Sequence, residues 1–216
     1  MPAASASAPE PATAFPFIGG RPALNFVATL GKRHTTPLER LPDPAALARW
    51  ITEAGLHTGA DDGPVRIGEA DLGHARTLRE AVYRLVRAAM LEEAPDPDDV
   101  TRVNEAAALP DLAPQFAEPY AGPRPVLRWT AARPGPAALA TVARDAVLLI
   151  GGPLLGRVKE CENPTCSLLF LDDSQARRRR WCSMDRCGNL AKVAELPVPR
   201  PRRHPMKTKG NAVPVR

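Results

Sequence analysis

Apolar side chains recur at three- and four-residue steps along much of the chain, a spacing that places them on one face of an α-helix. The clearest case begins at Glu69, where Leu78, Val82, Leu85 and Val86 form one apolar stripe. The pattern predicts a mainly helical protein. The predicted helices cover 22–30, 41–56, 69–93, 98–109, 136–150 and 187–196.

Turn and capping residues set the limits of these helices. Asp43 precedes Pro44, which is a favourable first helical residue. Gly31 and Gly55 end the first two helices, and the prolines of 95–97 break the chain after the third. The arginines of the third helix lie mostly off its apolar stripe and are most simply its solvated face. They are Arg76, Arg79, Arg84 and Arg87.

Three short segments favour strands. Residues 120–130 are expected to form a hairpin arm, with Pro123 and Pro125 at its edge because proline cannot donate to a ladder. Residues 157–160 and 168–171 flank the first pair of cysteines. The predicted fold class is therefore mainly α with a small β hairpin, an α+β arrangement.

The chain has 216 residues and 44% hydrophobic content, enough for one sizeable core and a small appended module. Its net charge of +5 is unevenly distributed. Residues 177–216 hold nine Arg and three Lys against two acidic residues, a net of +10, which leaves −5 on residues 1–176. This asymmetry suggests a body attached to a module that meets a polyanion.

The two ends have compositions typical of disorder. Residues 1–15 are rich in Ala, Ser and Pro and lack the basic and apolar regions of a signal peptide, so we expect a disordered leader. Residues 197–216 are expected to form a basic, proline-rich disordered tail. No stretch approaches the roughly 18 apolar residues of a membrane span. The expected location is the cytoplasm, where cysteines are more often metal ligands than disulfides.

Four cysteines form two pairs of equal spacing, with four residues inside each pair and fifteen between them. Two short loops that each offer two thiolates can bind one ion tetrahedrally, which predicts one structural zinc ion. The alternatives are two disulfides or four free buried thiols. A redox dithiol is disfavoured because neither pair is C-x-x-C. The predicted ligands are Cys161, Cys166, Cys182 and Cys187.

The residues around the cysteines resemble a known family. Trp181-Cys182-Ser183-Met184-Asp185-Arg186-Cys187-Gly188-Asn189 is similar to the signature of the CGNR zinc finger. Residues 19–30 are similar to the opening motif of the ABATE domain, which precedes that finger in stress-induced transcriptional regulators of bacteria. The resemblance implies a helical ABATE-like regulatory domain over 16–152 and a treble-clef-like CGNR zinc finger over 153–196. This chain departs from the signature at Leu190, where the family has Arg, and prolines stop the last helix early.

The basic residues beside the finger are the candidates for contact with double-stranded DNA, where guanidinium groups meet phosphates and an Asn can read adenine. One alternative is that the arginines stabilise the zinc thiolates as neighbours, and another is that they are simply solvated. Trp181 either stacks on a base or covers the metal site. The candidates are Arg177, Arg178, Arg179, Arg180, Arg186, Asn189 and Lys192.

The body offers weaker candidates. Asn25 and Thr29 lie one turn apart on the first helix and, with Arg21 of the same segment, are candidates to line a pocket for a small-molecule effector. The alternative is that they cap or bridge neighbouring backbone. The sequence contains no phosphate loop, nucleophile motif or persuasive carboxylate pair, so we do not expect an enzyme.

The sequence thus favours a transcriptional regulator whose N-terminal domain senses a ligand or forms a homodimer and whose finger binds DNA. A non-enzymatic adaptor whose finger binds a protein is one alternative. A small-molecule-binding body with a purely structural finger is another.

Overall fold

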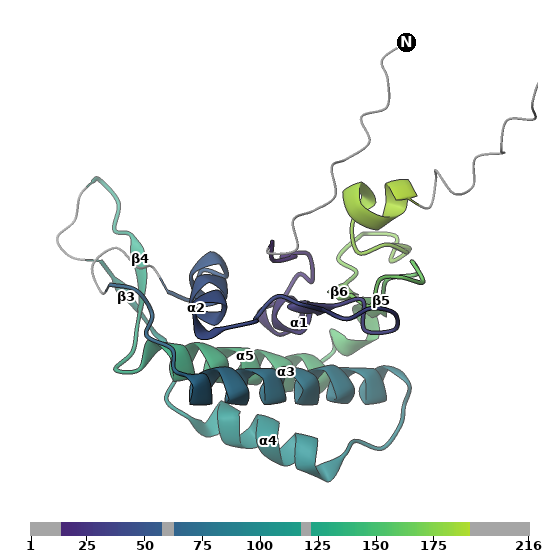
Figure 1. Cartoon of the computed structure of the whole chain (residues 1–216). Helices are drawn as coiled ribbons and strands as arrows, with labels where there is room; N and C mark the ends of the chain where they lie inside the picture. The colour runs from purple at the N-terminus through teal and green to yellow at the C-terminus, as the bar shows by residue number, and fades with distance from the viewer. Residues whose placement is uncertain (1–13, 58–62, 118–121, 191–216) are drawn as a thin grey trace, which may run out of the picture.

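The structure, a computed structural model, describes residues 14–57, 63–117 and 122–190. Three long helices, α3, α4 and α5, pack together, α1 and α2 lie on the other side of α3 and α5 from α4, and the cysteine-bearing segment lies at one end (Figure 1). The helices are α1 (Pro22–Val27), α2 (Pro44–Glu53), α3 (Glu69–Met90), α4 (Pro97–Ala108) and α5 (Pro134–Ile150). The strands are β1 (Leu30–Gly31), β2 (Leu38–Glu39), β3 (Ala113–Phe116), β4 (Leu127–Thr130), β5 (Val158–Glu160) and β6 (Leu169–Leu171). These strands form three two-stranded antiparallel sheets, β1 with β2, β3 with β4 and β5 with β6.

The core confirms a mainly helical fold with small β hairpins. The helices bury their apolar stripes around Trp50 and Phe26, whose ring centroids lie 5.0 Å apart. Helix α5 presents mainly alanines to this core, and small side chains allow the helices of the body to approach closely. Asp43 caps α2 as its sequence position indicated, because its carboxylate accepts the Ala46 N–H at 2.7 Å.

The first helix is shorter than predicted. It ends at Val27, and Leu30 pairs with Glu39 as part of β1. The physical reason lies at Thr29, whose hydroxyl and N–H both donate to the carbonyl of Phe26. A Thr side chain that bonds nearby backbone competes with the helical ladder and favours its end.

The predicted hairpin exists, but its strands are shorter than the sequence pattern suggested. Of the predicted 120–130 arm, the structure describes 122–130, and within these residues only Leu127–Thr130 is a strand, paired with Ala113–Phe116. Pro123 and Pro125 precede the ladder, where no N–H is needed. The hairpin lies at the end of the molecule opposite the cysteine-bearing segment (Figure 1).

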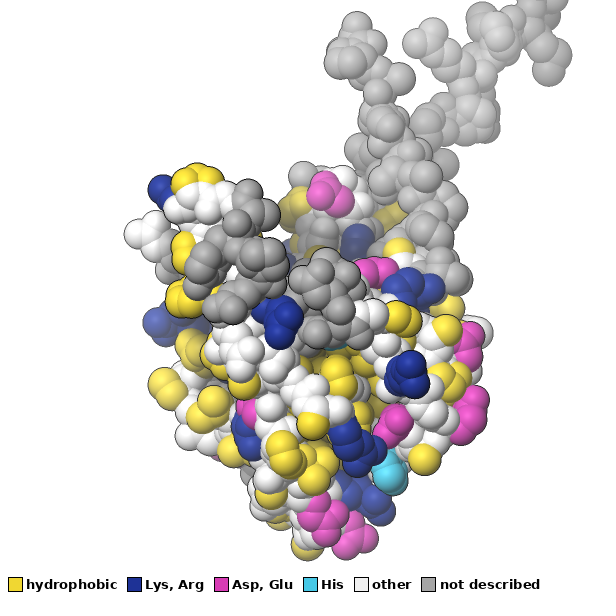
Figure 2. Space-filling model, turned by 90° about the vertical axis from the view of Figure 1, so that its left-hand side faces the viewer, with side chains coloured by type: hydrophobic (Ala, Val, Ile, Leu, Met, Phe, Trp, Pro, Cys, Tyr) yellow, Lys and Arg dark blue, Asp and Glu magenta, His cyan; other side chains and the backbone are white. Residues whose placement is uncertain are grey.

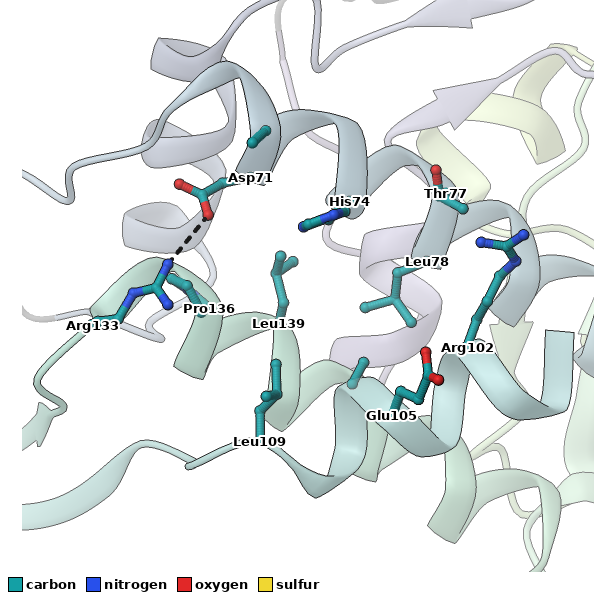
Figure 3. A pocket seen from close by; sticks show the side chains of 12 residues that line it. Asp71, His74, Thr77, Leu78, Arg102, Glu105, Leu109, Arg133, Pro136 and Leu139 are labelled. Atoms are coloured by element: carbon teal, nitrogen blue, oxygen red, sulfur yellow. Dashed lines mark ion pairs between the residues drawn. The ribbon is translucent and has the colours of Figure 1, made fainter. Parts of the chain in front are cut away.

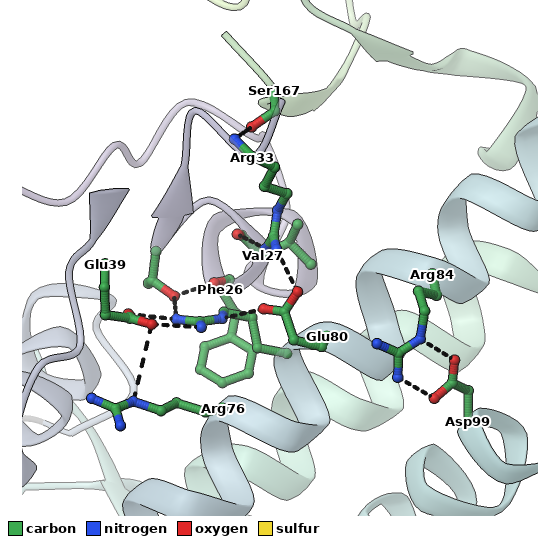
Figure 4. Close-up of polar contacts among 11 residues, drawn as sticks. Phe26, Val27, Arg33, Glu39, Arg76, Glu80, Arg84, Asp99 and Ser167 are labelled. Atoms are coloured by element: carbon green, nitrogen blue, oxygen red, sulfur yellow. Dashed lines mark hydrogen bonds and ion pairs between the residues drawn. The ribbon is translucent and has the colours of Figure 1, made fainter. Parts of the chain in front are cut away.

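The prediction that the arginines of α3 form a solvated face is wrong for Arg79. Its side chain is only 3% exposed and donates to both carboxylate oxygens of Glu39 at 2.7 Å and to Glu80 at 2.8 Å (Figure 4). Glu80 also accepts from Arg33. These contacts join α3 to the β1–β2 hairpin through a buried ionic network. The apolar periodicity could not reveal this network, because in sequence a buried Arg that forms ion pairs cannot be distinguished from a solvent-exposed Arg.

The cysteine-bearing segment packs directly against the helical body through β6. Side chains alternate along β6, as they do on any strand. Leu169 and Leu171 pack in the main core, whereas Phe170 packs with the cysteines. The N–H of Leu171 also donates to the carbonyl of Gly19 at 2.8 Å. A change at the metal site should therefore reach the body.

Some sequence predictions lie outside the described residues. Most of the predicted leader 1–15, the tail 197–216 and Lys192 are among them. Within the described ranges, no helix combines the length and apolar character needed to cross a membrane.

Candidate metal centre and basic surface

The four cysteine sulfurs converge on one point. They all lie within 4.8 Å of one another, although the two pairs are far apart in sequence. Cys182 Sγ lies 3.9 Å from Cys166 Sγ and 3.6 Å from Cys187 Sγ. A tetrahedron with zinc–sulfur bonds of 2.3 Å has sulfur–sulfur edges of about 3.8 Å. The donor set fits one structural zinc ion, which the four thiolates hold with no position left open for a substrate.

The first pair is positioned by the hairpin of β5 and β6. The Cys161 N–H donates to the carbonyl of Leu168 at 3.0 Å and closes the hairpin. Between the pair, the Asn163 side chain accepts from the N–H of Thr165 at 3.0 Å, and its carbonyl accepts from Cys166 at 2.8 Å. This Asx turn directs both thiols to the same side of the loop.

The second pair is positioned by a single turn of π-helix, Met184–Gly188. Ser183 caps it, with its hydroxyl accepting from Asp185 N–H at 3.2 Å and its carbonyl accepting from Cys187 N–H at 3.1 Å. A Cβ at Gly188 would lie 2.6 Å from the Met184 sulfur, so a larger residue here would have to displace the flexible end of that side chain. The helix predicted from Cys187 thus begins three residues earlier, and its continuation beyond residue 190 lies outside the described residues.

Crowding of the thiols perturbs their titration. The contact with Cys166 lowers the pKa of Cys161, and the contact with Cys161 raises the pKa of Cys182. Four bare thiolates repel one another, so four adjacent thiols share protons. The pKa values of such thiols shift in opposite directions. A divalent cation relieves this repulsion and lets all four ionise, so zinc binding releases protons.

Aromatic and apolar side chains surround the sulfurs. Phe170 and Leu168 are buried against them, and Trp181 packs on the same cluster while remaining partly exposed. The guanidinium of Arg180 lies 5.0 Å from the Trp181 ring centroid. Trp181 is therefore placed as a cover over the metal site, in agreement with the second of its two sequence interpretations.

A buried aspartate organises the loop that carries the arginine run. Asp172 is fully buried and accepts from Lys159 Nζ at 2.7 Å and from the N–H of Arg179 at 3.0 Å. The Lys159 ammonium, with the hydroxyl of Ser174, holds the pKa of the Asp172 carboxyl well below its usual range. Lys159 also donates to the carbonyl of Arg177 at 2.7 Å. The backbone of the run is thus fixed from within.

The four arginines of the run do not play one role. Arg179 folds back on the site, donating to the carbonyls of Trp181 and Cys182 and lying 4.5 Å from the Phe170 ring centroid. Arg180 pairs with Glu162 at 2.6 Å on the surface. The exposed side chains of Arg177 and Arg178 make no ion pair within the part of the chain that the structure describes. The run therefore combines a structural half with an outward-facing half.

The remaining candidates lie on the last turn. Asn189 is exposed and Arg186 is partly exposed with interactions of its own. Leu190, the position where the family signature has Arg, is 62% exposed. A side chain at this position reaches solvent rather than packing against the sulfurs.

The three body candidates have partners inside the fold. Asn25 accepts the Gly19 N–H at 2.8 Å, which closes the turn before α1. Thr29 is fully buried and bonds Phe26, and Arg21 donates to Asp145 on α5 at 3.0 Å. These contacts agree with the alternative that the segment bridges neighbouring backbone and elements.

Sequence reasoning missed two residues of the site, Asp172 and Lys159. A pair of aspartates separated by three residues from the arginine run was the available signal, since a carboxylate there can bind the backbone of the loop. Lys159 lies on a strand in which only Val158 is buried, and it carried no signal of its own.

Comparison with known families agrees with this geometry. The family model for ABATE, described as "Putative stress-induced transcription regulator", matches residues 20–153. The model for the CGNR zinc finger matches residues 157–197, which include all four cysteines. No curated protein matches the chain.

Proposed function

The chain belongs to the ABATE family and carries a CGNR zinc finger, and on that premise we propose that it is a non-enzymatic transcription regulator that binds double-stranded DNA through the finger. The observation that carries the proposal is the outward-facing half of the arginine run. Arg177 and Arg178 are exposed on a loop whose backbone is fixed by Asp172 and Lys159.

This arrangement suits phosphate contact for two reasons. Guanidinium groups without carboxylate partners do not have to give up an ion pair when they meet a phosphate. A fixed loop loses little conformational entropy on binding. Asn189, which is exposed on the last turn of the finger, offers an amide suited to a base edge.

The division of the run gives a specific test. The double variant Arg177→Ala/Arg178→Ala should weaken binding to a random-sequence duplex and reduce the slope of log K against log salt by about 1.8, since each phosphate contact contributes about 0.9. Fluorescence anisotropy of a labelled duplex over a salt series measures the slope. Arg124→Ala, an exposed arginine of the distant hairpin loop, is the matched control and should leave the slope unchanged.

Two outcomes would contradict the proposal. One is an absence of affinity for duplex DNA at low salt by the zinc-loaded chain. The other is a salt slope that the double variant and the control change equally. Capture of one acidic protein by the finger, without nucleic acid, would favour the adaptor function instead.

The departure at Leu190 predicts a gain of affinity. Because this position is 62% exposed beside Asn189, Leu190→Arg should add one phosphate contact and steepen the salt slope by about 0.9. Leu148→Arg, on an equally open position of α5 at 69% exposure, is the control for the added charge alone. An equal gain in both variants would show that net charge, not position on the finger, determines binding.

A further inference from the structure

A groove of about 560 Å³ opens between α3, α4 and α5, away from the finger. Figure 2 views the molecule from the end where the hairpin lies and shows apolar side chains in the hollowed centre of this face, with charged and histidine side chains beside them. This volume is in the range of sites that bury a small organic molecule. Neither the family descriptions nor the proposed DNA contact assigns a role to it.

The floor of the groove is apolar. Leu78 of α3 and Leu139 of α5 point into it, and Leu109, at the end of α4, closes it on the third side (Figure 3). Ala106 and Ala70 line the helix faces between them, so small side chains leave the space open. Leu109 is 46% exposed, which means that part of this apolar surface meets water in the free protein. An apolar ligand body would cover it.

Each end of the groove holds one arginine and one carboxylate, but the ends differ in whether that carboxylate already has partners. At one end Arg133 and His74, from different elements, converge beside Asp71 (Figure 3). The Asp71 carboxylate accepts the Gly68 N–H at 3.0 Å and forms an ion pair with the Arg133 guanidinium at 3.9 Å. Arg133 stays 77% exposed and has further N–H groups to donate. This end therefore offers donors to an anion.

The other end does not favour an anion. Arg102 and Glu105 lie one turn apart on α4 and both line the groove. Among the described residues Glu105 accepts no hydrogen bond, so its carboxylate would repel a negatively charged group placed beside Arg102. This difference between the two ends determines the orientation in which an anionic ligand would bind.

We propose that this groove binds an organic acid, a molecule with an apolar body and one carboxylate, whose carboxylate meets Arg133 and His74. The apolar body lies on Leu78, Leu109 and Leu139. The binding does not require DNA. The role of the groove as the effector site of a regulator, however, rests on the proposed function.

The groove also lies on a helix that contacts the finger. Helix α3 lines the groove with its N-terminal half. Its C-terminal half carries Glu80, which accepts from Arg33, and Arg87, which pairs with Glu160 of β5. The Arg33 N–H in turn donates to Ser167 Oγ, within the cysteine-bearing segment, at 2.9 Å. One continuous helix thus contacts both sites.

The test uses the zinc-loaded full chain without DNA, and 8-anilinonaphthalene-1-sulfonate as a fluorescent apolar anion. Decanoate should displace the probe, and decan-1-ol, which has the same apolar body and no charge, should displace it far less well. Ala106→Phe fills the groove and should abolish probe binding. Ala108→Phe, exposed on the same helix outside the groove, should leave it unchanged.

The two arginines then test the direction of binding. Arg133→Ala should weaken decanoate binding about tenfold, the value of one charge-assisted hydrogen bond, while Arg102→Ala leaves it close to the unmodified protein. Both are surface changes, and circular dichroism melting confirms that each variant remains folded. Equal displacement by decanoate and decan-1-ol, an unchanged probe signal in Ala106→Phe, or an equal loss in the two arginine variants would overturn the proposal. None of these outcomes depends on whether the finger binds DNA.

Discussion

Loss of zinc is expected to unfold the finger and to destabilise the helical body with it. The fifteen residues between the cysteine pairs have too little apolar surface to stay folded without the ion, so Cys182→Ser should remove both the bound zinc and the ordered loop. The body then loses the packing of Leu169 and Leu171, which belong to its core. Losses of this kind cost about 3 kcal/mol for each large side chain.

We expect the melting temperature of the helical body to fall by roughly 12–24 °C, since the two side chains together contribute about 6 kcal/mol and each 1 kcal/mol shifts a domain of this size by about 2–4 °C. Calorimetry of the protein with and without a chelator measures the fall, and elemental mass spectrometry should give one zinc per chain before treatment and none in Cys182→Ser. Chelator added to Cys182→Ser is the control and should change nothing further. If the body melts at the same temperature with and without zinc, the finger and the body unfold independently, which would contradict this prediction.

The cysteine site could be predicted from sequence because its information is local. Spacing within each pair determines which sulfurs can share a side, and Asn163 and Gly188 mark the turns that aim them. The helices were predictable for a similar reason, since each apolar stripe repeats within a single element.

What the sequence did not reveal depends on contacts between distant segments. The strand pattern of β6 shows two faces but not that one of them packs in the body and the other on the metal. The arginine run looks uniform in sequence, yet Asp172 and the carbonyls of the site hold Arg179 inward. The groove between α3, α4 and α5 is absent from the sequence pattern altogether, because it exists only where three helices do not fill the space between them.

Replacing Arg79 by Met should destabilise the body more than any other arginine substitution on α3. Arg79 uses all its nitrogens, with two bonds to Glu39, one to Glu80 and one to Thr29 at 3.3 Å. Its removal leaves two carboxylates close together without their shared cation (Figure 4). Breaking a buried pair typically costs 3–5 kcal/mol, and since Glu39 and Glu80 remain partly exposed we expect about 3 kcal/mol. Urea unfolding measures the difference, with the exposed Arg124→Met as the control.

The loss of Arg79 should depend on pH, because Glu39 and Glu80 lose the cation that they share, and this dependence separates an ionic cause from a packing cause. Burial alone would raise the pKa of Glu39, but hydrogen bonds from Arg79 outweigh it and hold the pKa below the ordinary value of 4.5. A depressed pKa means that the pair stabilises the protein above pH 4.5 and loses this contribution as the pH falls further. The difference in unfolding free energy between Arg79→Met and the unmodified protein should therefore become smaller in acid. Adding Glu39→Gln to Arg79→Met should recover part of the lost unfolding free energy at neutral pH. If the difference in unfolding free energy is constant with pH and unaffected by Glu39→Gln, the aliphatic stem of Arg79 stabilises the body and its charge does not.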